Sequence, residues 1–447
     1  MRYTPHTAAD KERMLQTVGV RSIEDLYQHI PESLRQDSAI HLPHGLSELQ
    51  VRKRLASLAA RNANAAEWSL FLGGGIYHHF IPSTVDALIS RSEFATSYTP
   101  YQPEVSQGTL QALFEFQTLI CQLTGMEVAN AGVYDGASAM AEALLMSRRI
   151  QPVKRRHVLI SRAVHPQYRE VAATYFKNLT DVQLEEVPVD STGATDLNQL
   201  RSRLNDAAMS VVVGYPNFFG VIEDLAPIRA ACERSGAHLV TVTEEPLALA
   251  LLKPPGDCGA DIAVGEGQSL GVPMTLGGPG FGFFASRKKF VRSMPGRLVG
   301  ETVDTEDRRG FVLTLATREQ HIRREKATSN ICTSQTLCAL AATVFMSLMG
   351  KTGLRRLAEI NLSRAQDARQ RLIREAGLDP VFSGPCFNEF VMRAESIEHL
   401  FRRCAEERIV PGVPLQKWYP ELRNCFLICV TDMNEREEIE RLVRAVA

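Results

Sequence analysis

Short strands rich in β-branched residues alternate with helical segments between residues 105 and 290, and this alternation constrains the fold most. The segments between the earlier strands are long enough for helical crossovers, which join parallel strands and cover both faces of a sheet. We therefore expect an α/β fold with a mostly parallel sheet. The clearest helices are 107–124, which stops at Gly125, and the alanine-rich 136–149. The expected strands are residues 157–161, 182–189, 210–215, 238–243, 261–264 and 280–286.

The chain is expected to divide into three parts, because 447 residues exceed what one hydrophobic core holds. Residues 1–70 have a polar helical pattern and are interpreted as an N-terminal helical arm. Residues 71–325 contain the expected sheet and form the large domain. Residues 326–447 combine two long helical patterns, 333–350 and 352–376, with short strands, and are expected to form a small α+β C-terminal domain.

The composition is that of an ordinary packed protein, with 45% hydrophobic and 23% charged residues. Fifty basic against fifty-one acidic residues give a net charge of -1, which provides no general attraction to nucleic acid or to an anionic membrane. No run of about 18 apolar residues is present, so no membrane-spanning segment is expected.

The N-terminal sequence and the cysteines both favour a cytoplasmic location. The polar N-terminus lacks the apolar stretch of a signal peptide. The nine cysteines are scattered and form no CxxC pair. We therefore expect reduced thiols in a cytoplasm, with neither a disulfide framework nor a metal site.

A glycine-rich loop comes after the expected strand 261–264, in the stretch DIAVGEGQSLGVPMTLGGPGFG. GEGQSLG resembles the glycine pattern of a dinucleotide site, but that site needs a helix to begin at its third glycine. The next residues contain two prolines and four glycines, which disfavours this interpretation, and an acidic residue lies inside the loop. A connection between neighbouring strands and a site for pyridoxal phosphate remain as alternatives.

A pyridoxal-phosphate site requires a lysine, a helix N-terminus for the phosphate, an acid for the pyridine nitrogen and a ring that stacks on the cofactor. Gln268 stands where the lysine is expected. Asp135 precedes helix 136–149, near Ser138, and its carboxylate is expected to cap the helix and repel phosphate. His165 occupies the stacking position, and Glu244 comes after strand 238–243 where the acid is expected, although it is longer than the usual Asp.

Two further stretches, 71–80 and 97–106, combine aromatic residues with glycine or proline. Adjacent histidines in the first point apart, so a metal pair is disfavoured and a close backbone approach or an interface is expected. The second is too rich in proline for a helix and too aromatic for a solvated linker, so a covered surface is expected. The candidate interface residues are Tyr77, His78, His79, Tyr98 and Tyr101.

Several long motifs resemble the glycine decarboxylase P-protein of the glycine cleavage system, and within it the separate subunit 1 of two-subunit bacterial forms. The resemblance runs nearly from end to end. The motifs are SYTPYQPEVSQGTLQALFEFQTLICQLTGMEVANAGVYDGASAMAEA, YPNFFGVIED, LKPPGDCGADIAVGEGQSLGVPMTLGGPGFGFFA and TREQHIRREKATSNICTSQ.

The resemblance implies a fold-type-I pyridoxal-phosphate architecture, with an aspartate aminotransferase-like large domain and a small C-terminal domain. It implies decarboxylation of glycine on pyridoxal phosphate and transfer of the aminomethyl group to the lipoyl arm of H-protein. In this family the Schiff-base lysine belongs to subunit 2, and Gln268 matches its position. The resemblance therefore implies a degenerate pocket that binds no cofactor covalently, formed by Gln268, Asp135, Ser138, His165, Asn217 and Glu244.

The partners implied are subunit 2, in a heterotetramer with two copies of each subunit, the lipoylated H-protein and glycine. Neither nucleic acid nor a membrane is expected as a partner. Two alternatives remain: a non-catalytic scaffold for subunit 2, and an autonomous pyridoxal-phosphate enzyme that uses another lysine. The candidate lysines are Lys253, Lys288, Lys289 and Lys326.

A charged, loop-rich region is expected at residues 290–325. The basic run 287–289, with Arg292 and Arg297, is either a solvated face or a surface for an acidic carrier protein.

Overall fold

The computed structural model describes residues 5–35 and 42–447, and the chain separates into two units, Met1–Ala63 and Asn64–Ala447. In the first unit, a capping box begins each of the two longer helices, with Thr7 and Asp10 in one and Ser47 and Gln50 in the other. No described side chain of these two helices is buried. The α-helices of this unit are α1 (Ala8–Val18), α2 (Glu32–Arg35) and α3 (Glu48–Ala59).

The second unit is built on a seven-stranded sheet with the order β2-β8-β7-β6-β5-β3-β4. Five neighbouring strands, from β7 to β4, are parallel, whereas β8 and β2 are antiparallel to their neighbours. The expected mostly parallel sheet is confirmed: β3 and β6 match the prediction at both ends, and the other four strands match within two residues. The strands are β2 (Val128–Ala129), β3 (His157–Ser161), β4 (Gln183–Val187), β5 (Ala208–Gly214), β6 (His238–Thr243), β7 (Ile262–Glu266) and β8 (Gly282–Ser286).

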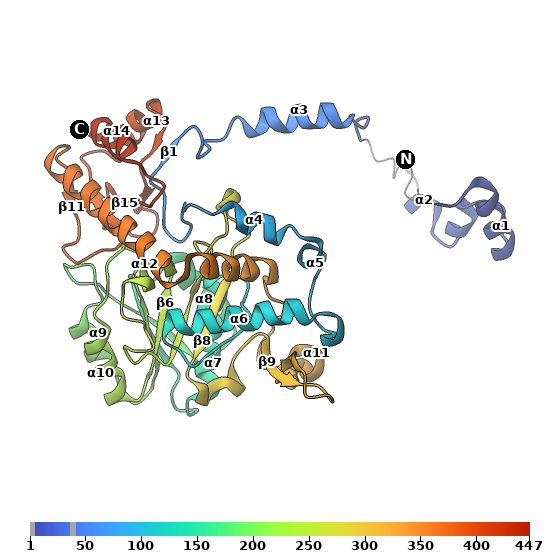
Figure 1. The fold of residues 1–447 in the computed structure, drawn as a ribbon, viewed down its shortest axis with the longest axis horizontal. Helices are drawn as coiled ribbons and strands as arrows, with labels where there is room; N and C mark the ends of the chain where they lie inside the picture. The colour runs from blue at the N-terminus through green and yellow to red at the C-terminus, as the bar shows by residue number, and fades with distance from the viewer. Residues whose placement is uncertain (1–4, 36–41) are drawn as a thin grey trace. The chain divides into compact units, whose positions relative to one another are not determined.

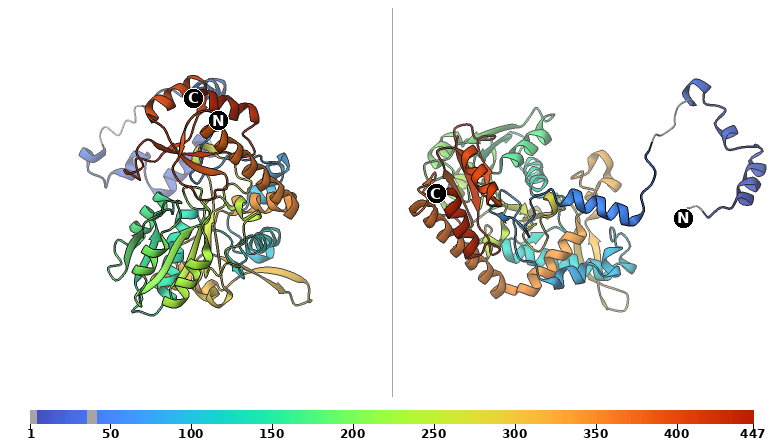
Figure 2. Two further views of the ribbon diagram at one scale, coloured as in Figure 1. Left: turned by 90° about the vertical axis from the view of Figure 1, so that its left-hand side faces the viewer. Right: turned by 90° about the horizontal axis from the view of Figure 1, so that it is seen from above.

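Helices cover both faces of this sheet (Figures 1 and 2), because successive side chains of each buried strand point to opposite faces. In β5, Val211 and Val213 pack in the cluster that contains residues of α6, α10 and the later helix α12 (Thr336–Arg374). Val212 packs on the other face, in the cluster that contains residues of α7 and α8. The helices are α6 (Gln107–Thr124), α7 (Gly136–Ile150), α8 (Pro166–Phe176), α9 (Leu197–Arg203) and α10 (Leu225–Ser235).

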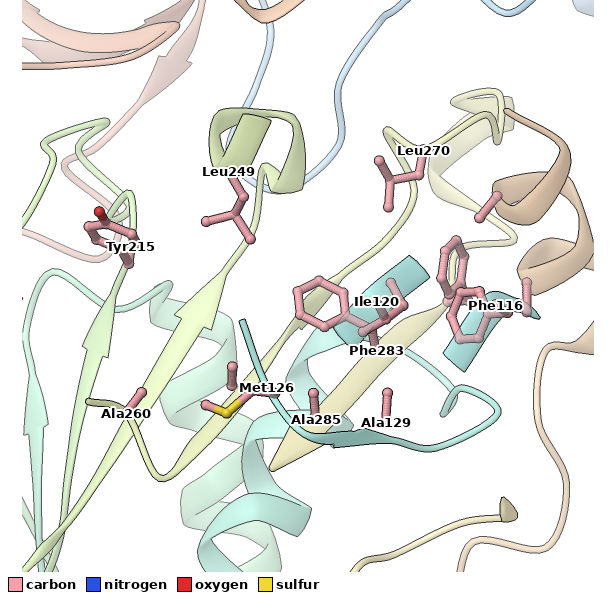
Figure 3. Packing of buried hydrophobic residues seen from close by; sticks show 14 of the residues in the cluster. Phe116, Ile120, Met126, Ala129, Tyr215, Leu249, Ala260, Leu270, Phe283 and Ala285 are labelled. Carbon is pink, nitrogen blue, oxygen red and sulfur yellow. The ribbon is translucent and has the colours of Figure 1, made fainter. Parts of the chain in front are cut away.

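The larger core cluster lies between the sheet and α6. Figure 3 shows Phe116 and Ile120 of α6 next to Phe283 of β8, and all three side chains are fully buried. The rings of Phe116 and Phe281 meet edge to face with centroids 5.7 Å apart. Aromatic packing of this kind holds α6 on the sheet beside the strands that end in the candidate site.

The long helix α12 (Thr336–Arg374) comes before the C-terminal strands and contains one break, at Gly350, where φ is 58°. This break separates the two helical patterns seen in the sequence, because glycine adopts positive φ without a steric penalty. The helix is long and apolar enough to pass a compositional test for a membrane span. Its Ala342, Phe345 and Met346 are nevertheless buried in the cluster shared with α6, as expected for a core helix.

The C-terminal region forms a separate group of strands and helices, drawn in orange and red in Figure 2. Its four-stranded antiparallel sheet has the order β11-β12-β15-β14. Strand β1, early in the sequence, pairs in parallel with β13 of this region. The elements are β1 (Ser69–Leu70), β11 (Asp379–Pro380), β12 (Glu389–Arg393), α13 (Ile397–Glu406), β13 (Ile409–Val410), β14 (Val413–Pro414), β15 (Cys425–Cys429) and α14 (Arg436–Val446).

The region 290–325 differs from the loop-rich prediction, because it contains an antiparallel hairpin of β9 (Leu298–Val303) and β10 (Arg309–Thr314). The Asp304 carboxylate closes its turn by accepting a hydrogen bond of 2.9 Å from the Arg308 amide. The charged residues around this turn concealed the strand pattern. The remaining short helices of the second unit are α4 (Ser83–Ile89), α5 (Ser92–Ala95) and α11 (Gln320–Arg323).

Replacing Phe116 by Ala should lower the free energy of unfolding by about 3–5 kcal/mol, because it leaves a cavity between α6 and the sheet. Urea denaturation followed by circular dichroism measures the loss. Leu276→Ala is the control, since Leu276 is 98% exposed, and its effect should stay within about 0.5 kcal/mol. Similar losses for the two variants would contradict the packing described.

Candidate functional site

The candidate site lies where the strands β3, β6 and β7 end at the carboxyl edge of the parallel sheet, which is where open α/β sheets bind ligands. A cavity of about 770 Å³ opens there, beside the first residues of α7 and α8. Its lining includes Gly75, Tyr134, Asp135, His165, Glu266 and Gly278.

Gln268 is buried and its amide group is engaged by the backbone on both sides. Its Oε1 accepts a hydrogen bond of 2.8 Å from the Tyr77 amide. Its Nε2 donates to the carbonyl oxygens of Tyr77, at 3.1 Å, and of Val272, at 2.6 Å. A lysine ammonium donates but accepts no hydrogen bond, so it could not replace the acceptor that Gln268 offers to the Tyr77 amide.

Two carboxylates meet the N-terminus of α7. Asp135 is the N-cap, as predicted, and its Oδ1 accepts a hydrogen bond of 2.7 Å from the Ser138 amide. The Glu266 carboxylate accepts from the Gly136 amide and from the Phe281 amide, each at 3.0 Å. Burial raises the pKa of Glu266 to about 7. The sequence signalled Glu266 only as an acid inside the glycine-rich loop.

His165 is the N-cap of α8 and is held by two hydrogen bonds. Its Nδ1 accepts from the Gln167 amide at 3.2 Å, and its Nε2 lies 2.9 Å from the Gly74 carbonyl oxygen. These partners require a neutral ring with the proton on Nε2, and burial lowers the pKa of His165 to about 4. The ring stacks on Tyr168 with centroids 4.8 Å apart, at an interplanar angle of 29°.

Glu244, directly after β6, is fully enclosed. Within the described residues, neither oxygen of its carboxyl group has a hydrogen-bond partner. Burial, together with the charge of Glu389, raises the pKa of Glu244 well above its usual value. This environment favours the protonated, neutral form of the side chain.

Asn217 lies outside the residues that line the cavity and serves the turn after β5. Its Nδ2 donates to the Gly193 carbonyl oxygen at 2.9 Å, and its Oδ1 accepts from the amides of Phe219 and Val221 at 3.0 and 3.1 Å. Of the predicted pocket residues, Asp135 and His165 line the cavity, whereas Gln268, Ser138, Glu244 and Asn217 do not.

The segment 71–80 is tied into this chain, which differs from the expectation that its aromatic residues face a partner. Tyr77 is buried and its hydroxyl donates to Glu389 Oε2 at 2.9 Å. His79 is buried between Glu245, at 2.8 Å, and Asp432, at 2.5 Å. His78 is partly buried, and its carbonyl oxygen accepts a hydrogen bond from the Thr431 hydroxyl at 2.6 Å.

His79 is the cation of this buried cluster. Burial alone lowers the pKa of His79, but the charges of Glu245 and Asp432 outweigh that effect and raise it to about 10. The same contact lowers the pKa of Asp432, although burial raises it. His79 therefore stays protonated at neutral pH and joins the segment 71–80 to the segment after β15.

Tyr98 and Tyr101, in the segment 97–106, remain on the surface. Tyr98 is 74% exposed and Tyr101 is 53% exposed. The Tyr101 hydroxyl accepts a hydrogen bond of 2.9 Å from Arg297, whose guanidinium lies 4.9 Å from the centre of the Tyr101 ring.

The basic run contributes less exposed charge than the sequence suggested. Arg297 is buried and lies 3.5 Å from Glu319, so it is not part of a solvated face. Arg287 is partly buried and donates to the Ala260 carbonyl oxygen. Only Lys288, Lys289 and Arg292 of this group are exposed, and Glu127 and Glu233 lie in the same surface hollow as the lysines.

The residues present do not fit covalently held pyridoxal phosphate. Gln268 has no nucleophilic amine, and two amides at the α7 N-terminus, those of Gly136 and Ser138, already donate to Glu266 and Asp135. Among the described residues that line the cavity, none is a lysine or arginine. A search of residues 5–35 and 42–447 also finds no group of three metal-ligating side chains.

The comparisons with known proteins agree over the whole chain. The model of the glycine cleavage system P-protein family matches residues 1–446. The chain is 49% identical over 444 residues to the probable glycine dehydrogenase (decarboxylating) subunit 1 of Anoxybacillus flavithermus, covering 99% of this chain and 98% of that protein. It is 48% identical over 446 residues to the protein of the same name from Carboxydothermus hydrogenoformans, covering 100% of this chain and 99% of that protein.

Solved structures show the same similarity. A crystal structure of glycine decarboxylase (P-protein) of the glycine cleavage system, in inhibitor-bound form, superposes with a TM-score of 0.91 at 44% identity, over 100% of this chain and 99% of that one. The sphingosine-1-phosphate lyase of Burkholderia pseudomallei has a TM-score of 0.66 at 16% identity, over 93% of each chain, and shares the fold. The expected fold-type-I architecture is confirmed.

Between about pH 6.5 and pH 10, the free energy of unfolding should fall, because the folded chain retains the His79 proton that the unfolded chain releases. The stabilisation from His79 is complete below about pH 6.5 and is lost as the pH rises toward 10. His79→Gln should cost about 3–5 kcal/mol near neutral pH, because Glu245 and Asp432 then lose their cation. Urea denaturation across this pH range measures both effects.

His78→Gln is the matched control, since it changes the neighbouring imidazole and leaves the His79 ion pairs in place. Burial also raises the pKa of Glu266 to about 7 and of Glu389 to about 8, so a slope below pH 8 should survive in His79→Gln. Equal losses in the two histidine variants, or a wild-type stability independent of pH above 8, would contradict the assignment.

Proposed function

Because the chain belongs to the glycine cleavage system P-protein family, we propose that it is subunit 1 of a two-subunit glycine dehydrogenase (decarboxylating). With subunit 2, the complex decarboxylates glycine and transfers the aminomethyl group to the lipoyl arm of H-protein, as an oxidoreductase of glycine catabolism. The observation that supports assigning the cofactor to subunit 2 is the environment of Gln268. Its buried amide group forms hydrogen bonds with the Tyr77 backbone, at the position where the family places a lysine.

The pyridoxal phosphate is assigned to the partner subunit. Its chemistry is the withdrawal of electrons from the bond that breaks at the glycine α-carbon. In this chain the engaged amide of Gln268 and the occupied N-terminus of α7 support a pocket without a covalently bound cofactor. This chain alone is therefore expected to be inactive.

We assign to the exposed aromatic segment 97–106 the role of completing the partner's pocket. Tyr98 and Tyr101 present large rings and hydroxyl groups to the outside of this chain. Such side chains exclude water and orient a carboxylate by hydrogen bonding, which decarboxylation requires. Arg297 fixes Tyr101 by a hydrogen bond and by its position over the ring. Tyr77 and His79, being buried, are assigned to supporting this chain's own fold.

The assembly proposed is a cytoplasmic heterotetramer with two copies of each subunit, which meets the lipoylated H-protein during turnover. A non-catalytic scaffold for subunit 2 is the second candidate. This candidate is favoured by the hydrogen bonds that Gln268 and Glu266 already form with backbone amides of this chain.

Replacing both Tyr98 and Tyr101 by Phe should reduce glycine decarboxylation by the complete complex at least about tenfold, a loss of about 1.4 kcal/mol of transition-state stabilisation. The change removes two hydroxyl groups and keeps the rings. Release of labelled CO2 from glycine, measured at saturating H-protein with both subunits present, reports the rate.

Tyr27→Phe is the control, because Tyr27 is 51% exposed but lies in the N-terminal unit. Gel filtration of each variant with subunit 2 verifies assembly. Full activity of an assembled Tyr98→Phe/Tyr101→Phe complex would contradict the proposed role of these tyrosines and favour the scaffold.

A further inference from the structure

The start of α7 binds a carboxylate at the position where this fold would receive a phosphate. We propose that Glu266 is a built-in anion that occupies the N-terminus of α7 and, together with Asp135, makes the cavity reject phosphate esters. This inference goes beyond the proposed function, because it concerns which ligands this chain's own cavity admits.

The contacts of Glu266 reproduce those of a bound anion. One carboxylate oxygen accepts from the Gly136 amide in the first turn of α7, and the other accepts from the Phe281 amide, each at 3.0 Å. Unpaired amides at a helix N-terminus, with the positive end of the helix dipole, form the usual phosphate site of α/β proteins. Glu266, which is 5% exposed, already accepts from one of these α7 amides, at the positive end of the helix.

The chain packs closely around Glu266 at two glycines. A Cβ on Gly136 would lie 2.4 Å from the Tyr168 hydroxyl and 2.9 Å from the Glu266 amide nitrogen. A Cβ on Gly280 would lie 2.7 Å from Glu266 Oε1. Glycines at these two positions therefore let the chain close around the carboxylate.

A second carboxylate, that of Asp135, accepts from a different amide at the N-terminus of α7. Asp135 is exposed and caps the Ser138 amide, at the mouth of the cavity. Glu170 also lines the cavity, and the described lining residues include no lysine or arginine. A phosphate ester would meet three acidic side chains and no positively charged one, which disfavours its binding.

A purely structural brace is the competing interpretation, in which Glu266 only joins α7 to β8. The two interpretations differ in the expected effect of removing the carboxylates. A brace predicts lost stability and no new ligand affinity. A built-in anion predicts that removing the charges creates affinity for phosphate.

The test uses the full-length chain and inorganic phosphate, titrated calorimetrically at constant ionic strength. Asp135→Ser/Glu266→Gln removes both charges while keeping a capping hydroxyl and an uncharged acceptor. This variant should bind phosphate with a Kd at least about tenfold lower than the wild type.

Asp224→Ser/Glu223→Gln is the matched control and should behave as the wild type. Asp224 is also an N-cap, on α10, and Glu223 is also a buried carboxyl group that accepts from a backbone amide, at 3.0 Å. Equal phosphate affinity in the wild type and the cavity variant would overturn the proposal, provided that circular dichroism shows a folded variant.

A measurement on the wild-type chain keeps the proposal testable if the cavity variant does not fold. Fluorescence titration should give the same affinity for pyridoxal and for pyridoxal 5′-phosphate. A preference of about tenfold or more for the phosphorylated form would overturn the proposal. Neither measurement involves glycine, subunit 2 or H-protein, so its failure would leave the proposed function standing.

Discussion

The side chains at the end of β7 hold the candidate site together through hydrogen bonds to distant backbone. Gln268 joins the sheet edge to the segment around Tyr77, and Glu266 joins it to the first turn of α7. The buried side chains of Gln268 and Glu266 satisfy backbone groups that would otherwise lack a partner, and an unsatisfied buried group costs about 1–3 kcal/mol.

Four buried glutamate side chains, Glu244, Glu245, Glu266 and Glu389, lie at or near this edge. Burial of so many acids is unfavourable unless they are protonated or paired. Glu244 and Glu389 have raised pKa values that favour their neutral forms. The Glu266 carboxylate instead accepts hydrogen bonds from two backbone amides, and Glu245 pairs with His79. The buried acids of this region are compensated within this chain, in line with the proposal that covalent cofactor chemistry belongs to the partner subunit.

The parts of this arrangement that depend on local sequence were predictable. The buried strands are recognisable from runs of β-branched residues, and Asp135 caps α7 because N-cap preference is a local property. The absence of a lysine in the loop is also evident from the sequence directly.

The remaining features depend on contacts between residues far apart in the chain. Glu266 bonds Gly136 across 130 residues, and Tyr77 meets Glu389 across 312 residues, so no local pattern reveals either contact. For the same reason the sequence placed Tyr77 and His79 at an interface, although both are buried, and assigned Arg297 to the surface, although it pairs with Glu319. The β9–β10 hairpin was missed because charged turn residues interrupt its apolar pattern.

The central claim is that this chain belongs to the decarboxylase but does not hold its cofactor. Borohydride reduction of the complete complex, followed by mass spectrometry of each subunit, tests it most directly. The account predicts a pyridoxyl group on one lysine of the partner subunit and none on this chain. A stoichiometric pyridoxyl group on Lys253, Lys288, Lys289 or Lys326 of this chain would contradict it.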